Sequence, residues 1–321
     1  MVQVFSTMKD KPSAYPFLLP SETGLGAKKY YDYQPIEFSI STDSGRTWHS
    51  CFDDPELEGV YCYSAPDVQP ATQADTLKKV GLQDGQRLLS TSYDTRQLTM
   101  QIASMDNIDE GSSLLGYDAM QQFLVSREPY WICFASWPQR MYYVRAKMST
   151  PTYIGINWTA TVTFTDLIGL SRSVNTSLNY EGNIGFGNNM PNSPLKFTFS
   201  TNNFVLYNPS NVMINPRQRG HELKITLDGN SSGNMKLTNQ TTGTEMGRIG
   251  TTSTDKDGDK VTGSSFNGKF VIDGVRTTLN GKSDYINSDK GFITIAKGDN
   301  HFTVENFSGK ITFDFPFWWL S

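Results

Sequence analysis

Strict alternation of apolar and polar residues is the feature that most limits how this chain folds. It occurs three times in the first half, with the apolar members Ile36, Phe38 and Ile40, then Leu98, Met100 and Ile102, then Ala160, Val162 and Phe164. Successive side chains of a β-strand point to opposite faces, so each run predicts a strand with one buried and one solvated face. The first half is therefore predicted to be a β-domain.

One segment of this half instead follows a helical period. Residues 112–125, SSLLGYDAMQQFLV, place six apolar residues on one broad face, which we expect to be buried: Leu114, Leu115, Ala119, Met120, Phe123 and Leu124. Asp109 and Glu110 precede the segment at the positive end of the helix, and Pro129 lies beyond its end. Residues 129–148 then predict two more strands around a Trp-Pro turn.

The chain has 321 residues, which favours two domains. Periodicity stops between about 168 and 194, in a stretch rich in Gly, Asn, Ser and Pro that predicts a linker. Beyond it, short strand-like runs recur with turn signals every 8–12 residues, as in a β-sandwich. We expect an N-terminal domain at 1–172, a linker at 173–194 and a C-terminal domain at 195–321, all mainly β.

The last residues, ITFDFPFWWLS (311–321), contain two adjacent tryptophans. Alternation from Ile311 places Trp319 on the buried face with the phenylalanines and Trp318 on the opposite, solvent-facing side. An exposed Trp318 is the one candidate glycan-binding residue, because aromatic rings can stack on sugars. Pro316 indicates an edge strand and is able to shift this phase.

Composition excludes several other classes. The formal net charge is −4, which argues against binding nucleic acid by charge neutralisation, and no apolar run approaches the ~18 residues of a membrane span. The N-terminus lacks the pattern of a signal peptide. Cys51, Cys62 and Cys133 include no C-x-x-C pair, which is typical of free thiols in a reducing compartment. His49, Cys51 and Cys62 offer three potential metal ligands, but a structural zinc site usually needs four and their spacing matches no common pattern, so we expect no metal site.

No motif predicts catalysis or a cofactor. GDNH (298–301) brings Asp299 close to His301 but has no Ser or Cys nucleophile motif, and its Gly-Asp-Asn predicts a tight hairpin instead. DKDGDK (255–260) resembles the start of a calcium loop, yet Lys260 occupies the glycine position and Phe266 the position of the closing Glu. We therefore predict that the protein is not an enzyme.

The order of these segments resembles the distal tail protein (Dit) family of phages with long, non-contractile tails. In the N-terminal half the resemblance lies in SYDTRQLTMQIA, LLGYDAMQQFL and PYWICFASWPQRMYYVRAKM followed by WTATVTFTDL. In the C-terminal half it lies in NPSNVMINPR, MKLTNQTTGTEM, FVIDGVRTTLNG and ITIAKGDNHFTVEN. Segments 1–34 and 41–85 have no counterpart in this pattern and are expected to be ring-contact arms or attachment loops.

The resemblance implies a tail-tube-like N-terminal domain that assembles into a six-membered ring, and a galectin-like C-terminal sandwich. Such a ring joins the tail tube protein to the tail-associated hub protein and carries receptor-binding or baseplate proteins at the tail tip of the virion, after assembly in the host cytoplasm. DNA is expected to pass through the lumen without specific binding. Residues 1–193 hold 14 basic and 20 acidic residues, a net charge of −6 against +2 for 194–321, which predicts an acidic lumen wall.

Two alternatives remain open from the sequence. One is an adhesin that binds host cell-wall glycan through Trp318 and the C-terminal sandwich, although a galectin-like fold does not itself imply sugar binding. The other is a tail-tube subunit, which the size of the C-terminal domain disfavours.

Overall fold

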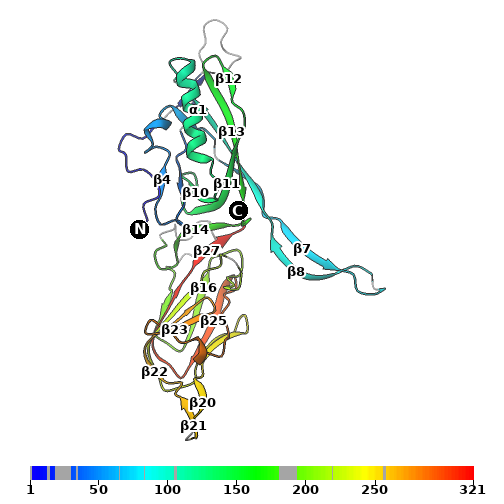
Figure 1. The fold of residues 1–321 in the computed structure, drawn as a ribbon, viewed down its shortest axis with the longest axis vertical. Helices are drawn as coiled ribbons and strands as arrows, with labels where there is room; N and C mark the ends of the chain where they lie inside the picture. The colour runs from blue at the N-terminus through cyan, green and yellow to red at the C-terminus, as the bar shows by residue number, and fades with distance from the viewer. Residues whose placement is uncertain are drawn as a thin grey trace. The chain divides into compact units, whose positions relative to one another are not determined.

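A computed structural model describes residues 2–12, 15–18, 30–33, 35–64, 66–82, 84–104, 107–180, 194–218, 220–255 and 258–321 (Figure 1). The chain divides into two compact units. Unit 1 comprises residues 1–174 together with 320–321, and unit 2 comprises residues 175–319.

Unit 1 is built on one antiparallel sheet. Its strands follow the order β4 (His49–Ser50), β3 (Phe38–Ser41), β10 (Tyr130–Phe134), β11 (Arg140–Met148), β13 (Asn157–Asp166), β9 (Arg96–Ser104) and β5 (Val60–Cys62). Short strands extend it: β12 (Thr152–Ile154) pairs with β13, β6 (Asp67–Val68) with β9, and β14 (Ser171–Thr176) with β11. Separate pairs are formed by β1 (Tyr15–Leu18) with β2 (Tyr30–Tyr33) and by β7 (Gln73–Lys78) with β8 (Arg87–Tyr93), and a 3₁₀ turn, η2, covers Pro55–Leu57.

The predicted alternation in 98–102 and 160–164 is confirmed by the register of β9 and β13. Ala160 lies opposite Ile102, Val162 opposite Met100, and Phe164 opposite Leu98, all on the buried face. The core of unit 1 forms on this face, where these six residues pack with Phe38, Ile132 and Val144. Opposite residues of antiparallel strands share a face, so matching alternation in two strands produces one continuous apolar layer.

The predicted helix is present as α1 (Glu110–Leu124), the one α-helix among the described residues. Asp109 caps it by accepting from the Ser112 N–H at 2.7 Å, and Ser112 completes a capping box. Met120 and Leu124 are buried as predicted.

The prediction that Leu114 and Leu115 are buried is wrong, because 60% and 71% of their surfaces are exposed. The helix approaches the sheet through its small residues instead. The Ser113 carbonyl accepts from Trp158 Nε1 at 3.0 Å, and a Cβ added to Gly116 would lie 3.0 Å from Val60. This close contact rotates both leucines outward.

Unit 2 is a sandwich of two antiparallel sheets. One follows the order β15 (Thr198–Phe199), β26 (Ser308–Asp314), β17 (Lys224–Ser231), β22 (Phe266–Asp273), β23 (Arg276–Leu279) and β24 (Lys282–Ser283). The other follows the order β16 (Asn203–Asn208), β25 (Gly298–Glu305), β18 (Met235–Asn239) and β19 (Thr244–Arg248). Phe313 of one sheet meets Phe204 and Phe302 of the other at ring-centroid distances of 5.8 and 5.0 Å, which joins the two layers. The predicted mainly β fold is confirmed.

The remaining elements of unit 2 are a separate hairpin of β20 (Thr251–Asp255) and β21 (Gly258–Thr262), a 3₁₀ turn η3 (Tyr285–Asn287) and the final strand β27 (Pro316–Trp319). Strand β14 runs to Thr176, inside the predicted linker at 173–194, and residues 181–193 of that linker lie outside the described residues. No helix in the described part of the chain is long and apolar enough to cross a membrane.

Candidate assembly surface and buried polar clusters

The structure places Trp318 and Trp319 in the core of unit 2, each with 0% of its surface exposed. All four residues of β27 are buried. The prediction that Trp318 faces solvent is therefore wrong: both faces of this strand are covered, so alternation no longer separates an inner from an outer side. Trp319 is buried, as predicted, and its ring meets Phe317 edge-on at 6.1 Å.

His221 covers the face of the Trp318 ring. The two rings stack with centroids 5.3 Å apart, and His221 Nδ1 accepts from the Asn215 N–H at 3.2 Å. On its backbone, Trp318 donates to Ser210 Oγ at 3.0 Å and accepts from the Asn211 N–H at 2.8 Å. Burial lowers the pKa of His221 from 6.5 to about 4, so the ring is neutral at pH 7. A sugar would have to displace this histidine to stack on Trp318.

The prediction of a hairpin at GDNH is also wrong, because Gly298–Glu305 is the continuous strand β25. Only Gly298 takes a positive φ, of +79°, and the next residues pair with β16. Asn300 is buried and holds the preceding loop: its Oδ1 accepts from Ala296 N at 2.8 Å and from Asn239 Nδ2 at 3.0 Å. Asp299 and His301 project from the exposed face of the same strand, and the His301 backbone N–H donates to Thr241 Oγ1 at 2.9 Å.

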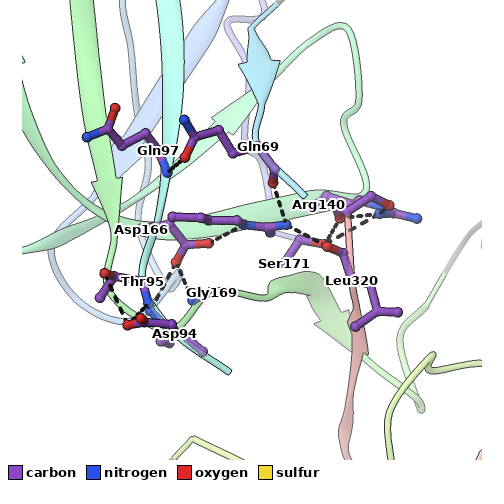
Figure 2. Close-up of polar contacts among 12 residues, drawn as sticks. Gln69, Asp94, Thr95, Gln97, Arg140, Asp166, Gly169, Ser171 and Leu320 are labelled. Carbon is purple, nitrogen blue, oxygen red and sulfur yellow. Dashed lines mark hydrogen bonds and ion pairs between the residues drawn. The ribbon is translucent and has the colours of Figure 1, made fainter. Parts of the chain in front are cut away.

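Unit 1 contains a buried charged cluster, shown in Figure 2. Arg96 Nε donates to Asp166 Oδ2 at 3.0 Å, and Arg96 Nη1 donates to the Leu320 carbonyl at 2.5 Å. Arg140 Nη1 donates to the Ser321 hydroxyl at 2.6 Å and to its carbonyl. Burial raises the pKa of the Asp166 carboxyl, whereas the adjacent Arg96 guanidinium opposes that shift. Arg96 and Arg140 thus hold residues 320–321 within unit 1, although Arg96 Nη2 is buried without a hydrogen-bond partner among the described residues.

The three cysteines are buried free thiols. Burial raises the pKa of Cys62 to about 12 and also raises the pKa values of Cys51 and Cys133. His49 is exposed, and no cluster of three potential metal ligands occurs among the described residues. In the DKDGDK segment, residues 256–257 lie outside the described residues.

The most distinctive surface is the hairpin of β7 and β8, hereafter the arm (residues 73–93). Figure 1 shows it extending away from the sheet of unit 1. Every described residue from Gln73 to Ser92 is exposed. An isolated two-stranded hairpin has too little apolar burial to be independently stable in water, and this one also exposes large apolar side chains: Leu77, Val80, Leu82, Leu88 and Leu89. From the sequence, the first half of the arm was assigned only to segment 41–85, which has no counterpart in the Dit pattern, and the strand pairing was not predicted. Gly81 and Gly85 mark the turn of the hairpin.

The two units define a class of protein: a mainly β chain with a one-helix β-domain that carries a projecting arm, plus a β-sandwich. This chain is similar to the Dit protein of phage SPP1. The crystal structure of that protein is described as a paradigm of the hub adsorption apparatus in phages that infect Gram-positive bacteria. The TM-score is 0.53 at 13% identity, over 88% of this chain and 99% of that one. This likeness shows a shared fold and confirms, at that level, the resemblance seen in the sequence.

Two structures of the phage P2 baseplate in its activated conformation, with calcium and with strontium, also contain similar chains. Each has a TM-score of 0.35 and 11% identity, covering 88% of this chain and 97% of that one. No model of a protein family matches the sequence, and no curated protein matches it significantly.

Proposed function

We propose that this protein is a structural hub component of a phage tail tip, in which six copies form a closed ring. The observation that carries the proposal is the shared fold with SPP1 Dit, which extends over both units and nearly the whole of that protein. Fold alone does not define function, so a feature of the chain itself has to support assembly.

The arm supplies that support. Its apolar side chains are exposed in a single copy, and burying them against another copy would stabilise both the arm and the contact. A projecting element that inserts into a different surface of the next copy makes a head-to-tail contact, and such contacts close into rings when the rotation between copies permits.

Native mass spectrometry of the full chain tests this assembly. We expect one closed cyclic species, six times the 35.9 kDa chain mass. A strictly monomeric protein at all accessible concentrations would refute the ring.

In the proposed tail tip, the ring lies between the tail tube protein and the tail-associated hub protein, and it anchors receptor-binding proteins. Gold-labelled antibodies against the chain are expected to mark the tail tip of virions and not the capsid. The acidic excess of residues 1–193 is proposed to line the lumen, where it would keep DNA from binding. A neutral or basic lumen in a structure of the assembled ring would contradict that part.

The glycan-binding alternative loses its motivating observation, because Trp318 is buried beneath His221. We retain it only as an outcome of a glycan array with the purified protein, where we expect no binding that depends on Trp318.

A further inference from the structure

Unit 1 is not continuous in the sequence. Its last two residues, Leu320 and Ser321, follow only after the whole of unit 2. They bond to side chains far earlier in the chain: Leu320 lies 224 positions after Arg96, and Ser321 lies 181 positions after Arg140. A chain is synthesised from its N-terminus, and domains generally fold in that order. The unit that is synthesised first therefore lacks two of its residues until the second unit has been made.

Polar contacts in the interior of unit 1 hold these two residues (Figure 2). Arg96 and Arg140 are buried, each with 3% of its surface exposed. The Arg96 guanidinium donates to the Leu320 carbonyl at 2.5 Å, and the Arg140 guanidinium donates to the Ser321 hydroxyl at 2.6 Å. The Ser171 hydroxyl donates to the Ser321 carbonyl. Leu320 itself is 38% exposed, so the attachment depends more on these hydrogen bonds than on burial of the leucine side chain.

The two buried guanidinium groups need these acceptors, because an arginine side chain stays protonated in proteins. Arg96 Nε donates to the Asp166 carboxylate at 3.0 Å, whereas Arg96 Nη2 is buried without a hydrogen-bond partner among the described residues. Without Leu320, Arg96 Nη1 would retain the Gln69 carbonyl at 3.3 Å, which is a longer and weaker bond. A buried charge with too few hydrogen bonds is strongly unfavourable, so the loss of these acceptors would destabilise unit 1.

We infer that residues 320–321 are a folding latch: unit 1 reaches its full stability only when this segment supplies acceptors to Arg96 and Arg140. A chain that stops before Leu320 contains every described strand of unit 1 but leaves the two guanidinium groups short of acceptors. Local opening of unit 1 would therefore distinguish such a chain from one that contains the latch, although the missing residues lie beyond unit 2 in the sequence. This inference concerns a single copy and does not depend on the proposed ring.

Ending the chain at Trp319 provides the first test. In calorimetry, unit 1 of this variant is expected to melt about 5–10 °C below the parent, because hydrogen bonds to charged groups are lost. Amides of β9 and β14, the strands that carry Arg96 and Ser171, should exchange with deuterium at least about ten-fold faster, whereas amides of β17 and β22 in unit 2 should exchange as in the parent. Leu320→Ala is the matched control: it shortens the side chain but keeps the carbonyl, so it should behave like the parent.

Two further variants keep the test decisive if the shortened chain precipitates. Ser321→Ala removes one acceptor of Arg140 at full length and should speed exchange in β14 about three-fold. Arg140→Gln combined with Ser321→Ala should destabilise unit 1 by less than the sum of the single changes, since both remove the same hydrogen bond. Parent-like melting and exchange in the shortened chain would refute the latch. Equal destabilisation by Leu320→Ala, or strict additivity in the double variant, would also refute it.

Discussion

Replacing Trp318 with alanine should strongly destabilise unit 2. The side chain is fully buried, packs on His221 and lies near Gly220, whose added Cβ would be 3.5 Å from the indole. Truncating a buried tryptophan removes its transfer free energy and leaves a cavity, at a cost of about 3–5 kcal/mol. For a unit of this size, that loss corresponds to a decrease in melting temperature on the order of 10 °C. We expect Trp319→Ala to behave similarly, since its side chain is equally buried.

Calorimetry of the full chain measures the effect. Trp318→Phe should recover part of the loss because it retains an aromatic ring against His221. Tyr285→Ala in the same unit removes an aromatic side chain that is 40% exposed, and it should change the melting temperature little. If Trp318→Ala melts like the parent while Trp319→Ala does not, Trp318 is solvent-facing in solution and the burial argument fails.

Three further predictions concern buried polar groups. Folding lowers the pKa of His221 from 6.5 to about 4, so as the pH falls the imidazole is protonated in the unfolded chain before it is protonated in the folded one. The contribution of His221 to the free energy of unfolding should therefore be constant above pH 6.5 and fall by about 3 kcal/mol as the pH drops to 4. Urea unfolding at several pH values checks this, and His221→Gln should reduce the slope. Asn300→Ala leaves the Ala296 N–H without its acceptor and should cost about 1–3 kcal/mol, measured by the urea midpoint, whereas an unchanged midpoint would contradict the role of its hydrogen bonds. Iodoacetamide should modify none of the cysteines in the native protein and all three in guanidinium, since burial raises their thiol pKa values; native-state labelling seen by mass spectrometry would refute this.

The sequence pattern was sufficient to predict a strand and its buried face where only one face of that strand is buried. The strands containing Leu98 and Phe164 were predicted in the correct phase because their polar partners point to the other face of the sheet. The helix predicted at 112–125 is present at Glu110–Leu124, so the helical period located it, but that period did not predict which of its faces is buried. Ser113 and Gly116 allow an approach that hydrophobicity alone does not reveal.

The surroundings of Trp318 and the arm were harder to predict from the sequence than the strands of unit 1. Trp318 was assigned to solvent by extending an alternation into FWWL, a run without a polar residue to define its phase. Such a run is also typical of a strand covered on both sides. The arm was missed because its strands are short, carry a register shift after Thr76, and bury no side chain whose spacing would show a period.

By itself the sequence determined the mainly β class, the helix and the facing apolar positions of the central strands, since each depends on the direction in which neighbouring side chains point. Only the tertiary structure decided which surfaces are covered. Burial of Trp318 depends on His221, 97 positions away in the sequence, and the exposure of Leu114 depends on how closely α1 approaches the sheet. Covering a surface requires residues distant in sequence, and local periodicity carries no information about them.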